Sequence, residues 1–134
     1  MTTHARGTFD VTLAPQPTAN PGEGPSLGRM SIDKRFRGDL EGTSKGEMLT
    51  AGTPVKGSAG YVAIERVSGT LHGRGGTFIL QHSGTMTRGA PHLVVTVVPD
   101  SGTGELEGLA GTMTIDIRDG AHSYAFAYSL PTAP

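Results

Sequence analysis

The sequence predicts an all-β protein, a single antiparallel eight-stranded barrel spanning residues 1–134. The chain contains 21 glycines and 9 prolines, and inside a helix each glycine costs about 1 kcal/mol and each proline about 3 kcal/mol. Apolar and polar residues alternate along most of the chain, which is the period of a strand with one buried face. No helical period lasts beyond two turns. Strands of this kind can close into a barrel, which removes exposed edges.

The first strand is predicted in residues 6–15, where Phe9, Val11 and Leu13 share one face. Residues 15–27 then contain four prolines and two glycines without periodicity. They are therefore expected to form a long exposed loop, which is a candidate lid over the barrel.

The next strands are predicted in residues 28–36 and 38–52, and then in residues 59–67 and 76–87, where glycines mark turns or bulges. Residues 69–73 are either a short link or a continuation past a bend. In the second strand a lysine alternates with apolar residues on one face, which consists of Met30, Ile32, Lys34 and Phe36.

Three further strands are predicted after residue 90. Residues 92–98 form the first, and residues 110–130 contain two more. Asp119 and Gly120 separate the last two strands, and this dipeptide is a strong signal for a two-residue hairpin turn.

The glycine-rich loop after residue 98 is predicted to be a turn and not a phosphate cradle. A phosphate cradle needs a helix directly after the loop and, in a P-loop, a lysine. Here alternation returns from residue 112 onward, and the spacing of Gly102, Gly104 and Gly108 is not a dinucleotide fingerprint. Pro99 ends a strand, and the glycines allow positive φ or a close backbone approach at a barrel corner.

This loop also carries a resemblance. The string SGTGELEGLAG is similar to the glycine-rich segment of plant allene oxide cyclases and dirigent proteins, with matches at Gly102, Thr103, Gly104, Leu106 and Gly111. Those families are eight-stranded antiparallel barrels. The cyclase's catalytic glutamate does not align with Glu47 or Glu65, so the resemblance implies no cyclase activity on a fatty-acid epoxide.

The chain resembles more closely a bacterial family of uncharacterised small proteins with the allene oxide cyclase-like barrel. This resemblance covers residues 59–86, 97–113 and 122–131. It implies the barrel fold and a homo-oligomer, and it carries no assigned activity.

Composition excludes several classes of function. The chain has no cysteine, so it has no disulfide, thiolate nucleophile or cysteine-ligated metal. Its formal net charge is -1, which does not favour nucleic acid or an anionic membrane as a partner. The first residues lack the apolar run of a signal peptide, and no run approaches the roughly 18 apolar residues that span a bilayer. A cytoplasmic protein is expected.

Glu65 and His82 are the candidate catalytic residues, because they fall on neighbouring predicted strands. A carboxylate held in an apolar interior tunes an adjacent imidazole, which makes an acid–base pair near neutral pH. Which face of each strand points inward stays open. The candidate ligand-binding residues are Tyr61, Phe78, Leu80, Tyr124 and Tyr128.

A structural role is the alternative for both candidate catalytic residues. His82 is then a core histidine bonded to backbone, and Glu65 pairs with Arg66 or Arg74 at the surface. Metal binding is not predicted, because the spacing of the histidines matches no metal motif. No cofactor is expected.

Two functions are therefore weighed. The first is a barrel that binds a hydrophobic or amphipathic small molecule and isomerises or cyclises it through one acid–base pair, which suits an apolar pocket with a few polar groups. The second is a noncatalytic oligomeric module whose barrel interior is solidly packed. A cavity of a few hundred Å³ would favour the first.

Overall fold

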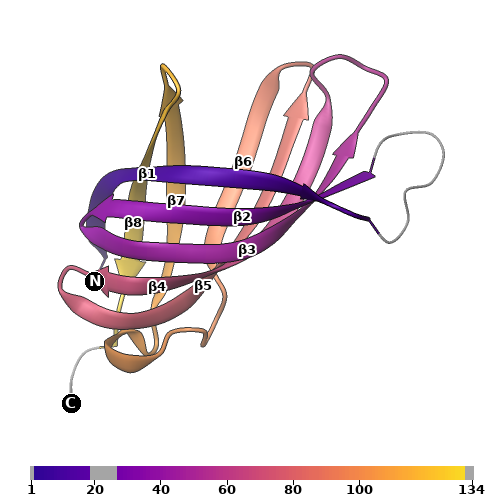
Figure 1. The fold of residues 1–134 in the computed structure, drawn as a ribbon. Coiled ribbons are helices and arrows are strands. Elements are labelled where there is room, and N and C mark those ends of the chain that lie inside the picture. Colours follow the sequence, from indigo (N-terminus) through magenta and orange to yellow (C-terminus); the bar gives the residue numbers. More distant parts are fainter. Residues whose placement is uncertain (1, 19–26, 132–134) are drawn as a thin grey trace.

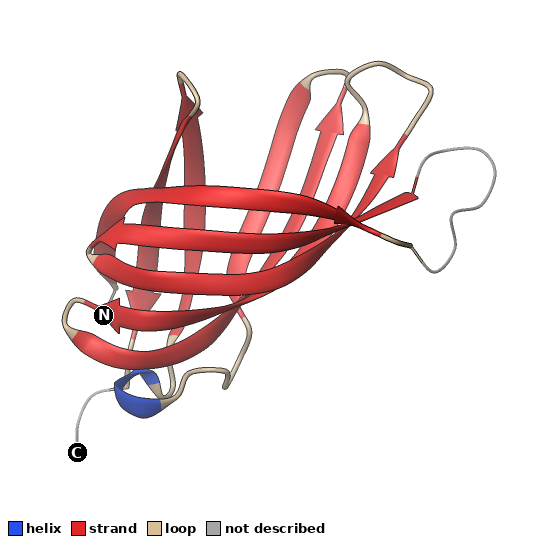
Figure 2. Ribbon diagram, viewed as in Figure 1, coloured by secondary structure: helices blue, strands red, loops and turns tan. Residues whose placement is uncertain are grey.

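The computed structural model describes residues 2–18 and 27–131 (Figure 1). They form a closed barrel in which consecutive strands pair antiparallel and the last strand pairs with the first. Figure 2 shows strands in nearly all of the described chain and one short helical turn. The elements are β1 (Thr3–Gln16), β2 (Leu27–Gly38), β3 (Leu40–Gly52), β4 (Ala59–Leu71), β5 (Arg74–Thr87), β6 (Ala90–Val97), η1 (Gly104–Leu106), β7 (Ala110–Arg118) and β8 (Ala121–Ser129). The predicted eight-stranded barrel is confirmed.

The turn between β7 and β8 forms at the predicted dipeptide. Asp119 has φ 51° and Gly120 has φ 79°, and two successive positive φ values are the signature of the type I′ hairpin turn. The β4–β5 and β5–β6 turns repeat this backbone pattern at His72–Gly73 and Arg88–Gly89.

The long loop between β6 and β7 contains one helical turn, η1, which the alternation of the sequence did not predict. The turn buries Leu106 completely. Gly104 has a φ of 61°, as expected for a turn glycine, whereas Gly102 is required by a close approach, since a Cβ there would collide with the carbonyl oxygen of Leu106. Residues 69–71 continue β4 past the predicted end. The core of the predicted lid, residues 19–26, lies outside the described residues.

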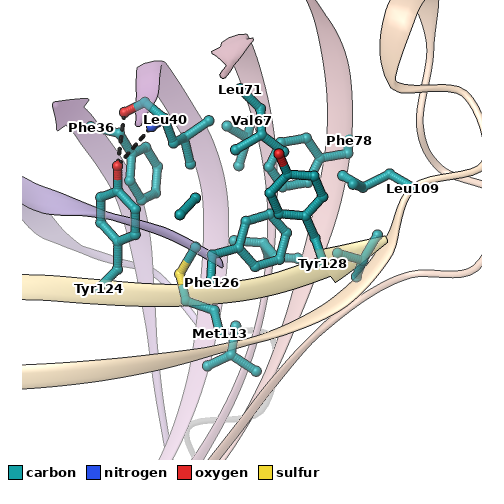
Figure 3. Close-up of a cluster of buried hydrophobic side chains, with 14 of the residues drawn as sticks. Phe36, Leu40, Val67, Leu71, Phe78, Leu109, Met113, Tyr124, Phe126 and Tyr128 are labelled. Atoms are coloured by element: carbon teal, nitrogen blue, oxygen red, sulfur yellow. Dashed lines mark hydrogen bonds between the residues drawn. The ribbon is translucent and has the colours of Figure 1, made fainter. Parts of the chain in front are cut away.

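One end of the barrel, which we call the closed end, is densely packed. The β6–β7 loop covers it, and both Leu106 and Leu109 are at most 1% exposed. Figure 3 shows aromatic and aliphatic side chains from β2, β4, β5, β7 and β8 meeting there. The rings of Phe78 and Phe126 stack with centroids 5.9 Å apart. This packing supplies the apolar burial that stabilises the fold.

The opposite end, which we call the open end, is not filled by the side chains of residues 2–18 and 27–131. The inward faces of the strands continue there with apolar residues, yet these residues stay exposed. Leu13 is 44% exposed, Met86 43%, Leu93 39% and Ile117 60%. An apolar wall that is left uncovered on the inside of a barrel is typical of a ligand-binding space.

The wall is also weakest at this end. β6 and β7 pair at only two positions, Val95 with Met113 and Thr96 with Thr112, and Figure 1 shows β7 and β8 diverging from β6 beyond them.

No helix in the described part of the chain is long and apolar enough to cross a membrane.

Candidate functional site

A buried network of charged and polar side chains lies in the middle of the barrel. Its centre is the Glu65 carboxylate on β4, which is 0% exposed. Oε2 accepts hydrogen bonds from Lys34 Nζ at 2.8 Å and from His82 Nε2 at 2.5 Å, and Oε1 accepts one from Ser44 Oγ at 2.7 Å. The carboxylate therefore bonds to side chains of its two neighbouring strands, β3 and β5, and of β2 beyond β3.

The strand register brings these residues together. Glu65 is paired with Gly46 on β3 and with Leu80 on β5. His82 and Ser44 each lie two residues along from those partners, and period 2 therefore keeps them on the same inward face. Lys34 is the register partner of Ser44. The absence of a side chain at Gly46 leaves space for Glu65, because a Cβ there would lie 2.6 Å from the Cα of Glu65.

Glu65 is ionised at neutral pH. Burial by itself would raise its pKa, but hydrogen bonds and charges from His82 and Lys34 outweigh burial and lower the pKa to about 2. The Lys34 ammonium is held in turn by the rings of Phe9 and Phe36, whose centroids lie 4.8 and 5.8 Å from Nζ. Glu65 is therefore a poor general base and a strong orienting group.

The second ring nitrogen of His82 is not used by the network. Nε2 donates to the carboxylate of Glu65, while Nδ1 has no hydrogen-bond partner among the described residues. The hollow that His82 lines has a volume of about 700 Å³ and is bordered by the outward-facing Leu49, Val62 and Gln81. An imidazole fixed by a carboxylate on one nitrogen and open on the other is the usual arrangement of a histidine acid–base catalyst.

A cavity of about 720 Å³ occupies the open end of the barrel. Its wall is mainly apolar and includes Met30, Met86 and Leu93, and its floor includes Tyr61 and Gly84. Neither Glu65 nor His82 lines the cavity. They are the next inward residues toward the closed end, because His82 precedes Gly84 by two positions on β5, and Glu65 follows Tyr61 by four on β4.

The structure separates the residues that the sequence suggested for the site. Glu65 and His82 are in contact, and Tyr61 lines the cavity. The other four candidates belong to the packed core cluster and do not line the cavity; they are Phe78, Leu80, Tyr124 and Tyr128.

The hydroxyls of the two core tyrosines are engaged at the closed end. Tyr124 Oη accepts from Leu40 N at 2.9 Å and can donate to the carbonyl oxygen of Leu40 at 3.1 Å (Figure 3). The carbonyl oxygen of Arg37, at 3.0 Å, is a second acceptor. Tyr128 Oη is 2.5 Å from His72 Nδ1. The two hydroxyls thus connect β8 to β2 and β3 and to the β4–β5 turn through hydrogen bonds.

The structural alternative for the acid–base pair differs from what is observed. Glu65 is buried and pairs with Lys34, so it makes no surface pair with Arg66 or Arg74. His82 bonds to a carboxylate and not to backbone.

Sequence reasoning did not select Lys34 or Ser44. The signal for Lys34 was present, because it alternates with Met30, Ile32 and Phe36 on an apolar face, and a charged residue in such a position must be paired if it is buried. Ser44 carries no comparable signal in a segment rich in small residues. Among the described residues no group of three or more histidine, aspartate or glutamate side chains is arranged to hold a metal ion.

Comparison with known proteins identifies a family and a related crystal structure. Residues 5–128 match the family described as "Protein of unknown function (DUF3224)". The crystal structure of a protein of unknown function from that family, from Shewanella oneidensis MR-1, is 54% identical in sequence. The match covers 99% of this chain and 100% of the other, with a TM-score of 0.95. No curated protein matches the chain. The similarity to allene oxide cyclases stays a prediction from the sequence.

Proposed function

This chain belongs to the DUF3224 family of proteins of unknown function, and from that premise we propose that it binds a hydrophobic or amphipathic small molecule in the open end of its barrel and isomerises or cyclises it by proton transfer. The observation that carries the proposal is an apolar cavity of about 720 Å³ directly beyond a buried, carboxylate-bound histidine. A volume of this size is within the usual range for small-molecule sites.

The two candidate catalytic residues take different roles in this proposal. Glu65 remains a carboxylate and fixes the ring of His82, so it is a positioning residue. His82 accepts or donates the proton through Nδ1. Lys34 compensates the charge of Glu65, which keeps the network close to neutral when the imidazole is neutral and allows it to stay buried.

Binding is tested with 1-aminoanthracene, a neutral apolar dye whose fluorescence rises in apolar sites. The chain has no tryptophan, so protein emission interferes little. Leu93→Asp places a charge in the cavity wall and is expected to weaken dye binding about tenfold or more. The matched control is Val94→Asp, because Val94 is the next residue on β6, is 45% exposed and faces outward. Equal effects of both substitutions, or no binding by the wild type, would contradict the proposal.

Proton transfer is tested separately by deuterium uptake at carbon from D₂O in a panel of apolar carbon acids, followed by mass spectrometry. His82→Asn is expected to abolish uptake that the wild type catalyses, a loss of about 100-fold or more for a general base. Gln81→Asn, the neighbouring residue on the outer face, is the control. Uptake that survives in His82→Asn would remove His82 from the chemistry.

The noncatalytic alternative is favoured by one observation, an exposed apolar patch on the outside of the barrel. Leu49, Val62 and Val94 lie on one line across β3 to β6 and are 45 to 56% exposed. The Arg29–Glu47 ion pair borders this patch. In a two-fold contact between two copies of the chain, Arg29 of each copy can therefore face Glu47 of the other copy. Light scattering tests self-association, and Val62→Asp is expected to give monomers if the patch is the interface.

A further inference from the structure

Tyr61 is the polar residue at the floor of the cavity, and the proton transfer proposed for His82 does not use its hydroxyl. It lies on the inward face of β4, four residues before Glu65, and lines the cavity together with Gly84. It therefore stands between the accessible space of the open end and the buried network of Lys34, Glu65 and His82.

The position of the ring is fixed by its register partner. Tyr61 pairs with Gly84 on β5, and a Cβ at residue 84 would collide with ring carbon Cε1 and lie 3.0 Å from Cδ1 and Cζ. Gly84 has no positive φ, so its backbone conformation does not require glycine. The Tyr61 ring occupies the space beside Gly84, so a larger residue there would have to displace the ring. This packing restricts where the hydroxyl can point.

The hydroxyl itself is available to a ligand. It has no hydrogen-bond partner among the described residues. Because no buried side-chain oxygen in that part of the chain is left without a partner, Tyr61 Oη must reach accessible space, and the space that Tyr61 lines is the cavity. A free donor at the floor of a mainly apolar cavity is the type of group that fixes the orientation of a ligand.

Electrostatics at the floor select the kind of acceptor. Burial, followed by the negative charge of Glu65, raises the pKa of the Tyr61 hydroxyl above its usual value, so the phenol stays protonated and donates. The same charge, which Lys34 offsets only in part, disfavours a ligand carboxylate at this place. Lys34 is bound to Glu65 and does not line the cavity. The cation that does line it, Lys56, belongs to the loop between β3 and β4 and not to the floor.

We propose that the Tyr61 hydroxyl binds a neutral carbonyl oxygen of an apolar ligand and thereby determines the substrate class, an apolar ketone or aldehyde in preference to the corresponding acid or hydrocarbon. The inference rests on the proposed function, since it assumes that the cavity takes a small molecule. A hydrogen-bonded carbonyl acidifies the adjacent C–H bond, so the proton that leaves that carbon would pass to His82 while Tyr61 stabilises the enolate oxygen.

The test uses acedan, 2-acetyl-6-dimethylaminonaphthalene, a neutral ketone whose emission moves to longer wavelength when its carbonyl accepts a hydrogen bond. Tyr61→Phe is expected to weaken acedan binding about three- to tenfold, the effect of losing one hydrogen bond, and to shift the emission of the bound dye to shorter wavelength. A structural role alone would not produce the shift. Tyr128→Phe is the matched control, because it removes a phenol hydroxyl at the closed end and is expected to change neither quantity.

Head-group selectivity is measured by displacement of 1-aminoanthracene with 2-acetylnaphthalene, 2-ethylnaphthalene and 2-naphthoate, three molecules of similar shape. The wild type is expected to prefer the ketone, and Tyr61→Phe to bind the ketone and the ethyl compound equally. If the wild type binds the dye but Tyr61→Phe binds acedan with unchanged affinity and emission, the inference about Tyr61 is wrong and the binding cavity stands. If the wild type binds no dye, the proposed function fails first.

Discussion

At the scale of single residues, Glu65 shows how a buried charge can be both a cost and a functional element. Its carboxylate accepts hydrogen bonds from Lys34, His82 and Ser44, and these three bonds hold the neighbouring side chains in place. A buried ion pair of this kind adds little net stability compared with apolar residues of similar size, whereas removal of one partner is expensive. The network is therefore better explained by orientation of His82 than by stability.

The lowered pKa of Glu65 predicts an acid-dependent stability. The folded pKa of about 2 is below the usual 4.5, so the unfolded chain binds the proton more readily between these values. The contribution of Glu65 is complete above about pH 4.5 and is lost as the pH falls toward 2. At about 1.4 kcal/mol per pKa unit, this contribution is roughly 3 kcal/mol.

Urea unfolding of the wild type and Glu65→Gln as a function of pH checks this prediction. The variant is expected to be less stable at pH 7 by roughly 3 to 5 kcal/mol and to lose part of the slope between pH 4.5 and 2. Glu47→Gln, which affects an exposed surface pair, is the control and should cost at most about 1 kcal/mol. Parallel profiles for wild type and Glu65→Gln would mean that Glu65 has its ordinary pKa.

At the scale of the elements, the seam between β6 and β7 distinguishes this barrel from a uniformly closed one. β4 pairs along its whole length with both neighbours, while β6 and β7 share two paired positions. Continuing the same antiparallel register would set residues 90–94 opposite residues 114–118. These backbone groups are left without a ladder partner on the seam side, which makes this the weakest part of the wall.

Hydrogen exchange measured by NMR tests the seam. The amides of residues 114–118 that point away from β8 are expected to exchange at least about tenfold faster than those of β4, because local opening there disrupts few contacts. Uniform protection across β7 would show instead that the seam is paired in solution.

At the scale of the whole molecule, the barrel divides its two tasks between its ends. The closed end holds the core cluster and the loop that caps it, so it supplies stability. The open end has apolar inward residues that the described part of the chain leaves exposed, and the proposed function assigns their burial to a ligand. Substitutions at the open end are therefore expected to change binding without unfolding the protein.

A pair of leucine substitutions checks the division. Leu106→Ala, at a residue that is 0% exposed, is expected to lower the free energy of unfolding by about 2 to 5 kcal/mol through a cavity in the packed end. Leu93→Ala, at the open end, should cost less than about 1 kcal/mol while weakening binding of 1-aminoanthracene. Similar losses of stability in both variants would contradict a separation of tasks between the ends.

Much of the fold could be predicted from local pattern. Alternation identified the strands, and Asp119–Gly120 identified one hairpin, because both signals lie within a few residues of sequence. The helical turn η1 was missed because three residues are too few to show a period. Glu65 and His82 were selected together because they fall on adjacent strands, but the same alternation gave no way to decide which face is inward.

By itself, the sequence determined the class of the fold and the order and approximate bounds of the strands, because these depend on residues that are close in sequence. It also gave the pairing of Glu65 with His82 as a hypothesis, because the two residues fall on neighbouring strands. Only the tertiary structure decided that Lys34 and Ser44 complete the network, that Tyr61 faces a cavity while Tyr124 and Tyr128 are packed away, and that β6 and β7 part at the open end. Those features depend on how eight twisted strands register around a closed ring, and that register is a property of all the strands together.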